Sequence, residues 1–298
     1  MKSSNWVGRF APTPSGPLHF GSLVAALGSY LITRSQNGQW LLRIEDLDTP
    51  RVVGGATQQI IHTLEMFGFE WDSEIVYQSQ RTQLYQQALT QLMRQQRLFC
   101  CRCSRQQIKR RNRGFYDGYC RNRILSIDNP NSNGFAVRIK FESGFESFYD
   151  EIRGKCHFAS PADTQDFVIK RRDKIFAYQL AVVVDDIAQG VNHVVRGADI
   201  LNSTPRQIYL YSCFQQPSPV YFHLPLVVDQ AQQKYSKTKL SPAIKADKAT
   251  YWLIQALEHL GQQPPDFLSE LKPQEVLIWA IDNWNLNKVG TDPKVYQA

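Results

Sequence analysis

The chain has 298 residues, of which 43% are hydrophobic and 20% charged, and this balance excludes an intrinsically disordered protein. It has no apolar run long enough to cross a bilayer, and its first residues lack the apolar core of a signal peptide. We therefore expect a cytoplasmic protein that does not bind membranes, with its six cysteines reduced or bound to metal. The net charge of +7 suits a polyanionic partner without requiring one.

The first hundred residues alternate between strand and helix patterns. The apolar stretches NWVGRFA (5–11) and WLLRIED (40–46) are typical of buried strands. The segment between them predicts a helix, because its apolar residues recur three or four positions apart: Phe20, Leu23, Val24, Leu27 and Leu31. A strand, a helix and a second strand form one βαβ unit, so we expect a parallel sheet. Helical spacing continues over 57–67 and 81–98.

The composition changes at Cys100. Residues 100–123 hold four cysteines and many lysines and arginines, and residues 126–165 look like short strands and turns. Buried-strand patterns then return at DFVIKRR, FAYQLAVVVDD and VNHVVRGAD, and YFHLPLVV predicts one more strand. The tail is helical by pattern, with Asp247 as a candidate N-cap and Gly261 as a helix stop.

These patterns predict an α/β protein with an interruption. We expect a Rossmann-like parallel-sheet catalytic domain whose two halves occupy residues 1–99 and 166–229. A basic inserted module spans 100–165, and a polar loop with a short helical C-terminal region spans 230–298. Ligands of such sheets bind beyond the carboxyl ends of the strands, where the N-terminus of a helix points at them.

Two motifs have the chemistry of a nucleotide site. In RFAPTPSGPLHFGSL (9–23), His19 and Gly21 open the first helix, where an imidazole can bind phosphate oxygens and a glycine lets a bulky group approach the backbone. In KYSKT (234–238), Lys234 and Lys237 can neutralise a leaving pyrophosphate. The alternatives are a histidine that only caps its helix and lysines in a solvated loop.

Taken together, these motifs resemble a known enzyme family. HFGS and KYSKT match the HIGH and KMSKS motifs of class I aminoacyl-tRNA synthetases. RFAPTPSGPLHFGSL, LLRIEDLDTPR, FAYQLAVVVDD, VVRGADIL and HLPLVV follow in the order of the glutamyl branch. Ser22, Tyr235 and Thr238 depart from the motifs, and Ser22 leaves the role of the second histidine unfilled. The resemblance implies catalytic roles for His19, Gly21, Lys234 and Lys237, with His19, Gly21 and Lys237 at ATP.

The resemblance implies a glutamate pocket, and several residues have suitable chemistry for one. Arg9 and Arg196 stand at predicted strand ends and can pair with a carboxylate, while Glu45 can hold an ammonium group. The alternatives are surface salt bridges, a turn carboxylate and, for the tyrosine of FAYQL, core packing. Asp185 and Asp186, at another predicted strand end, are expected to be structural. The resemblance implies that glutamate is bound by Arg9, Phe10, Ala11, Pro12, Thr13, Glu45, Tyr178 and Arg196.

The insert combines thiols with basic residues. CRC (101–103) and YDGYC (116–120) offer three thiolates, and spacing alone leaves a zinc site and reduced buried cysteines equally open. The resemblance implies one structural Zn²⁺ on Cys101, Cys103, Tyr116 and Cys120. The basic and aromatic residues around them favour contact with RNA over a merely solvated face.

The resemblance is strongest to truncated members of the glutamyl branch, because few residues follow Thr238. It implies an enzyme that uses ATP with Mg²⁺ to activate L-glutamate without tRNA. The glutamate would then pass to the queuosine base in the anticodon of tRNA(Asp), with the protein acting as a monomer. The alternatives are a compact glutamyl-tRNA synthetase acting on a tRNA 3′ end and a non-catalytic RNA-binding module. A small-cofactor nucleotidyltransferase is disfavoured by Ser22 and the glutamate motifs.

Overall fold

The computed structural model describes residues 6–122, 134–158, 160, 165–230 and 244–295. Its first unit is the predicted βαβ motif, with β1 at Val7–Phe10, α1 at Phe20–Arg34 and β2 at Gln39–Ile44. The two strands pair in parallel. Both are apolar and buried, apart from the first residue of β2 and the arginines discussed below. The prediction for this segment is confirmed.

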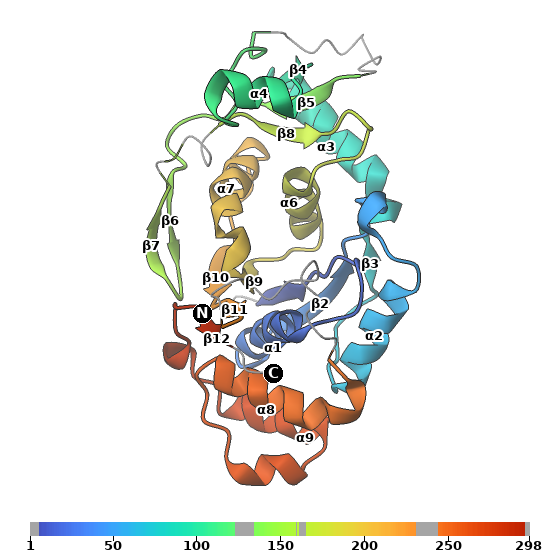
Figure 1. Ribbon diagram of the computed structural model, residues 1–298, viewed down its shortest axis with the longest axis vertical. Coiled ribbons are helices and arrows are strands. Elements are labelled where there is room, and N and C mark those ends of the chain that lie inside the picture. Colours follow the sequence, from blue (N-terminus) through green and yellow to red (C-terminus); the bar gives the residue numbers. More distant parts are fainter. Residues whose placement is uncertain (1–5, 123–133, 159, 161–164, 231–243, 296–298) are drawn as a thin grey trace.

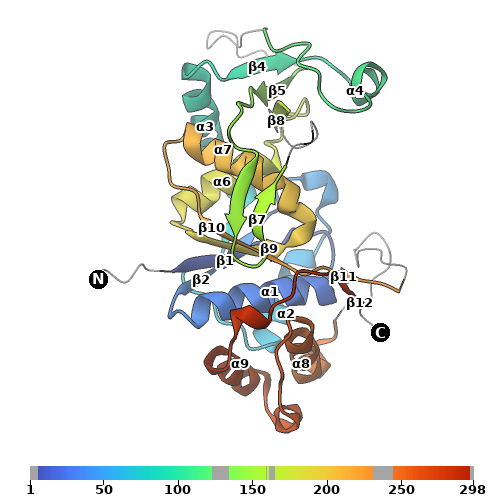
Figure 2. The same ribbon diagram turned by 90° about the vertical axis from the view of Figure 1, so that its left-hand side faces the viewer.

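A second parallel unit lies beside the first. β9 (His193–Gly197) and β10 (Val220–Leu224) pair in parallel, as do β2 and β3 (Val76–Tyr77). The backbone N–H of Asn192, just before β9, donates to the carbonyl of Val7, which places β9 next to β1. The strand order therefore reverses between β1 and β9. Helix α1 lies on one face of this sheet, and α6 and α7 lie on the other (Figures 1 and 2).

This arrangement confirms the predicted α/β class with a parallel sheet. In such folds the crevice beyond the carboxyl ends of the strands, at the point where the order reverses, is the usual ligand site. Arg9 in β1 and Arg196 in β9 both lie at that point. Two main cores flank the sheet, one between α1, α8 and α9, the other between α3, α6 and α7.

A separate antiparallel sheet forms the far end of the molecule (Figure 1). It has the order β4 (Leu98–Cys101), β5 (Ala136–Ile139) and β8 (Phe167–Lys170), and α4 (Arg105–Asn112) follows β4. The prediction that DFVIKRR belongs to the parallel sheet is therefore wrong, because β8 pairs antiparallel with β5. The periodicity of a strand says nothing about its pairing partner. The division of the chain into domains at residues 1–99, 100–165, 166–229 and 230–298 stays a prediction.

A hairpin connects the two sheets. β6 (Ser147–Asp150) and β7 (Gly154–His157) pair antiparallel, and β6 also pairs in parallel with β10 through Asp150 and Tyr221. Figure 2 shows this hairpin running from the antiparallel sheet to the edge of the parallel one. Residues from within 100–165 thus reach the sheet that holds the cleft.

The stretch FAYQLAVVVDD is a helix, and its prediction as a strand is wrong. It forms α6 (Tyr178–Ala188), in which residues Leu180 to Asp186 are all buried. A helix buried on every side has no polar face, so its sequence looks like a buried strand. Asp185 and Asp186 therefore lie within a helix and not at a strand end.

The C-terminal region packs below α1 (Figure 1). Helix α8 (Ala249–His259) has Lys248 as its N-cap, so the prediction of Asp247 as N-cap is wrong; Asp247 lies in the preceding short 3₁₀ turn. Gly261 has φ 77° just after the helix, as a helix stop requires. Within the described ranges no helix is long and apolar enough to span a membrane.

The remaining elements are α2 (Ala56–Met66), α3 (Thr82–Arg94), α7 (Thr204–Cys213), α9 (Pro273–Asp282), β11 (Val227–Val228), β12 (Lys294–Val295) and 3₁₀ helices at Thr49–Arg51, Gln78–Arg81, Ala198–Ser203, Ala246–Lys248, Asp266–Glu270 and Leu286–Lys288.

Candidate active site

Two adjoining hollows open at the carboxyl ends of β1 and β9. The first brings together most of the residues predicted for glutamate: Arg9, Phe10, Ala11, Thr13, Glu45, Tyr178 and Arg196. The second contains Pro12 with the predicted nucleotide residues His19 and Gly21. Both hollows share Phe10, Thr13 and Gly197, so a ligand in one can touch a ligand in the other. The structure thus places an amino-acid-sized site next to a helix N-terminus.

Arg196 is a buried cation without a carboxylate partner among the described residues. Its side chain is 5% exposed. Nη1 donates to Gln207 at 2.7 Å, Nη2 to Thr204 at 2.8 Å and Nε to Nε2 of His223 at 3.0 Å. All three acceptors are neutral groups. A buried charge needs a counter-charge, so this guanidinium is suited to an anionic ligand.

Arg9 is in a different situation, because it is already paired. Its Nε and Nη2 donate to the two carboxylate oxygens of Asp186 at 3.1 and 3.4 Å. Arg43 also contacts Asp186, at 2.8 Å. Both arginines hold the pKa of Asp186 below its usual range against the effect of burial. Arg9 therefore lines the cleft with its charge largely compensated, whereas the charge of Arg196 is available.

Asp185 ties four elements together behind the cleft. Its carboxylate accepts from Gln78 at 2.8 Å, Arg81 at 2.6 Å and Tyr85 at 2.7 Å, and Arg43 lies 3.9 Å away. These contacts join α6 to β2, to the 3₁₀ turn after β3 and to α3. The expectation of a structural role for this aspartate fits the geometry.

Glu45 faces the cleft from the end of β2. Its carboxylate is 3.6 Å from Nη2 of Arg43 and is almost fully buried. Burial raises its pKa to about 7, despite the nearby Arg43 and Arg9. A cation delivered by a ligand would stabilise the ionised form. The carboxylate is thus suited to an α-ammonium group.

Tyr178 is the first residue of α6 and lies between the two charges. Its hydroxyl is 3.5 Å from Nη1 of Arg196, at the limit of a hydrogen bond. Burial raises the pKa of this hydroxyl, so it stays protonated and can donate to a ligand.

His19 has a capping role and also lines the second hollow. It is the N-cap of α1, and its Nδ1 accepts from the backbone N–H of Ser22 at 3.3 Å. The imidazole lies over Gly21, where a Cβ would come within 3.2 Å of Cε1 of His19. A side chain at position 21 would therefore push the imidazole away. Lys234 and Lys237 lie outside the described residues.

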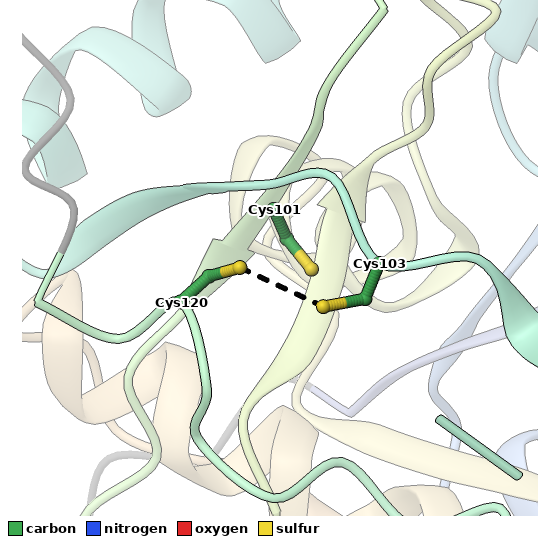
Figure 3. A group of neighbouring side chains, drawn as sticks. All are labelled: Cys101, Cys103 and Cys120. Carbon is green, nitrogen blue, oxygen red and sulfur yellow. Dashed lines mark hydrogen bonds between the residues drawn. The ribbon is translucent and has the colours of Figure 1, made fainter. Parts of the chain in front are cut away.

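Three cysteines of the insert converge at the far end of the molecule (Figure 3). The sulfurs of Cys101, Cys103 and Cys120 all lie within 4.8 Å of one another, and those of Cys103 and Cys120 are 3.6 Å apart. In a tetrahedral zinc site with Zn–S bonds of about 2.3 Å, two sulfurs are about 3.8 Å apart. The spacing of the three thiols is therefore compatible with a shared metal ion.

The surroundings of the thiols affect their ionisation differently, and burial raises the pKa of the Cys103 thiol. Burial opposes ionisation of Cys101, but hydrogen bonds from the backbone of Cys103 and from Arg138 outweigh it and lower the pKa of the thiol. The hydroxyl of Tyr116 accepts from the backbone N–H of Cys120 at 2.8 Å, beside the cluster. The three thiols could hold a metal ion, and the Tyr116 hydroxyl lies beside them.

Comparison with known proteins agrees with this geometry. The family model described as tRNA synthetases class I (E and Q), catalytic domain, matches residues 6–275. The chain belongs to this class I synthetase family.

The relatives of this synthetase are similar over nearly their whole length. It is 47% identical over 289 residues to the Glutamyl-Q tRNA(Asp) synthetase of Pseudomonas syringae pv. syringae, which covers 97% of this chain and 96% of that protein. It is 45% identical to the protein of the same name from Yersinia pseudotuberculosis, covering 95% and 84%. A glutamate-tRNA synthetase structure from Elizabethkingia anophelis matches with a TM-score of 0.81 at 24% identity, covering 99% and 68%, and supports the fold.

Sequence reasoning missed several residues that lie behind the cleft of this synthetase. Arg43, His223, Thr204 and Gln207 are all buried, and three of them surround Arg196. One signal was available for the first two, since a charged or polar residue inside an apolar strand needs a partner. The other two lie on α7 and give no such signal, because only the tertiary fold brings α7 to β9.

We expect the KM of glutamate in this synthetase to fall as the pH rises from 6 to 8. We expect the ligand ammonium group to bind ionised Glu45, whose pKa is raised to about 7, so protonation at lower pH should compete with binding. The fall should be about tenfold over this range. Initial rates of pyrophosphate exchange at several pH values measure it. Glu45→Gln should raise KM and remove the pH dependence, whereas a flat wild-type profile would contradict the role.

Proposed function

We propose that the protein activates L-glutamate with ATP, without tRNA, and transfers it to the queuosine base in the anticodon of tRNA(Asp). The observation that carries the first half is Arg196, a buried cation whose hydrogen-bond partners among the described residues are all neutral. It lines the same hollow as a buried carboxylate, Glu45. An amino acid with a carboxylate side chain supplies the missing anion at one end and an ammonium group at the other.

The charges define an orientation for the substrate. In our proposal the side-chain carboxylate of glutamate binds Arg196 and the hydroxyl of Tyr178, and the α-ammonium group binds Glu45. The segment from Arg9 to Thr13 forms the wall between the two hollows. The α-carboxylate would then point toward His19 and the N-terminus of α1, where ATP phosphates find N–H donors and positive charge.

Activation needs no nucleophile from the protein. The α-carboxylate oxygen attacks the α-phosphorus of ATP, the new P–O bond forms, and the bond to pyrophosphate breaks. The protein contributes positioning and stabilisation of the developing phosphate charge. His19, Gly21, Lys234 and Lys237 are proposed for this role, and Mg²⁺ supplies further neutralisation of the phosphates when it is bound with ATP.

Transfer forms an ester and releases AMP. A hydroxyl of the acceptor attacks the carbonyl carbon of glutamyl-adenylate. The bond between that carbon and the phosphate oxygen of AMP breaks, and the hydroxyl proton passes to the departing AMP or to water. The name of the relatives supports queuosine in tRNA(Asp) as the acceptor. Helix α4 is basic, and Arg111 stacks over the exposed ring of Tyr119 at 4.4 Å, which suits phosphates and unstacked bases.

We also propose that Cys101, Cys103, Tyr116 and Cys120 hold one structural Zn²⁺. The three sulfurs are suitably spaced, and the Tyr116 oxygen beside them is our candidate for the fourth position. β4 and α4, which flank the cluster, lie at the end of the molecule opposite the C-terminal helices α8 and α9 (Figure 1). The zinc would shape the basic insert and take no part in activation.

The acceptor is tested with tRNA(Asp) from cells that make queuosine and from cells that cannot. We expect labelled glutamate to attach only to the modified tRNA, because the acceptor hydroxyl is absent from guanosine. Nuclease digestion followed by mass spectrometry should find the glutamate on the queuosine nucleoside. Activation itself is measured as glutamate-dependent ATP–pyrophosphate exchange in RNA-free enzyme.

Two results would count against this proposal. Equal charging of unmodified tRNA(Asp), or efficient charging of tRNA(Glu), would indicate a compact synthetase that acylates a 3′ end. An absence of exchange in enzyme that still binds ATP would indicate an RNA-binding module without catalysis.

A further inference from the structure

Arg196 is the end of a buried chain of three side chains from three neighbouring strands. His223 on β10 stands between Arg196 on β9 and Asp150 on β6. Nδ1 of His223 is 2.6 Å from Oδ2 of Asp150, and Nε2 is 3.0 Å from Nε of Arg196. Asp150 and His223 are fully buried. Neither residue lines the cleft, so their effect on a ligand must pass through Arg196.

The contacts assign the tautomer of the imidazole. A guanidinium N–H is always a donor, so Nε2 of His223 must accept. The proton of the neutral ring therefore sits on Nδ1 and is donated to the Asp150 carboxylate. Burial lowers the pKa of His223 to about 4, against the hydrogen bond with Asp150, so the ring is neutral at physiological pH. The hydroxyl oxygen of Thr204 lies 3.2 Å from Nε2, and it can donate its proton to an unprotonated Nε2.

Asp150 is itself fixed by its backbone surroundings. Its Oδ1 accepts from the N–H groups of Arg153 at 3.0 Å, Ile152 at 3.1 Å and His223 at 3.3 Å. The other oxygen, Oδ2, is thereby directed at the imidazole. Because three N–H groups donate to Oδ1, an asparagine at position 150 must also place an acceptor, its amide oxygen, at the place of Oδ1.

We propose that the Asp150–His223 pair positions Arg196 and so sets the preference for a carboxylate over an amide in the ligand. The pair presents a neutral acceptor to Nε and fixes the plane of the guanidinium without neutralising it. A carboxylate or a protonated imidazole in the place of His223 would compensate or repel the charge that selects glutamate. The inference rests on the proposed function, because it presumes that Arg196 binds the glutamate side chain.

A purely structural role would be to join the hairpin of β6 and β7 to β10. Asp150→Asn separates the two roles. The amide oxygen stays with the three backbone N–H groups, so the amide NH₂ faces Nδ1 of His223. The imidazole must then accept at Nδ1 and carry its proton on Nε2, where it meets the N–H of Arg196. Two donors facing each other displace the guanidinium although the shape of the core is unchanged.

We expect Asp150→Asn to raise the KM of glutamate by about tenfold or more, with a smaller change in kcat. The preference for glutamate over glutamine should fall by a similar factor. Long-range ¹H–¹⁵N NMR of histidine-labelled enzyme should show His223 as the Nδ1–H tautomer in the wild type and the Nε2–H tautomer in the variant. A thermal melt shows whether the variant is folded.

Two variants of His223 complete the test. His223→Phe removes the acceptor, so Asp150→Asn should add no further loss of glutamate preference in that background. His223→Gln keeps a neutral oxygen acceptor for Arg196 and should stay closer to wild type than His223→Phe. The comparison of His223→Gln with His223→Phe also tests the proposal if Asp150→Asn does not fold.

The outcomes are distinct. Wild-type enzyme without glutamate-dependent exchange would refute the proposed function, whereas a wild-type His223 in the Nε2–H tautomer would refute this inference by itself. A folded Asp150→Asn enzyme with unchanged KM and preference would refute it as well. An equal loss from Asp150→Asn in the His223→Phe background would assign the pair a structural role.

Discussion

Replacing Arg196 with alanine is expected to lower kcat/KM for glutamate activation by roughly 30-fold to several thousandfold, or about 2 to 5 kcal/mol. The reason is that the side-chain carboxylate of glutamate would be buried without the guanidinium of Arg196 to balance its charge. The variant loses a charge that neutral groups held in place for the ligand, so the loss should appear for glutamate and much less for glutamine. Pyrophosphate exchange with each amino acid measures both.

Arg51→Ala is the matched control. Arg51 also lines the cleft, but its side chain is 67% exposed and paired with Asp48 at 2.7 Å. A solvated arginine is screened, so its removal should change glutamate kinetics less than about threefold. If Arg196→Ala keeps the wild-type preference for glutamate over glutamine, the assignment of Arg196 is wrong.

The parts of the fold that the sequence predicted are those that local pattern determines. The βαβ unit follows from two apolar strands and the spacing of Phe20, Leu23 and Leu27 on one helical face. Gly261 ends α8 because only a glycine tolerates its φ of 77° without strain. Arg9 and Glu45 reach the cleft because each lies at the end of a parallel strand.

The errors arose where tertiary context decides. Residues Leu180 to Val184 are apolar and partly β-branched, a run that fits a strand, yet they form a helix covered on every side. β8 has a strand pattern that is silent about its partner β5. The neighbours of Arg196 come from α7 and β10, and Asp150 on β6 contacts His223 behind it. Only the packing of these elements brings the side chains together, so no spacing rule can find them.

Loss of the proposed zinc is expected to unfold the end of the insert while glutamate activation persists. The core under the cysteines is small: Phe99, Cys101, Ile108, Tyr116 and Cys120, with Cys103 packed against them. So few apolar side chains cannot offset the conformational entropy of ordering α4 and its loops. A structural zinc contributes apparent binding energies of about 10 to 16 kcal/mol in small zinc domains, so its loss should dominate here.

We expect metal analysis of the wild type to find one zinc ion per chain, and Cys103→Ala should abolish it. Hydrogen exchange should rise over α4 and the 116–120 segment, and transfer to tRNA should be lost while pyrophosphate exchange stays near wild type. Cys100→Ala is the control, because Cys100 is adjacent in sequence but its sulfur lies outside the cluster. That variant should keep its zinc.

Stoichiometric zinc in a Cys101→Ala, Cys103→Ala double variant would rule the site out. Unchanged transfer by zinc-free enzyme would show instead that RNA binding does not depend on the ordered insert.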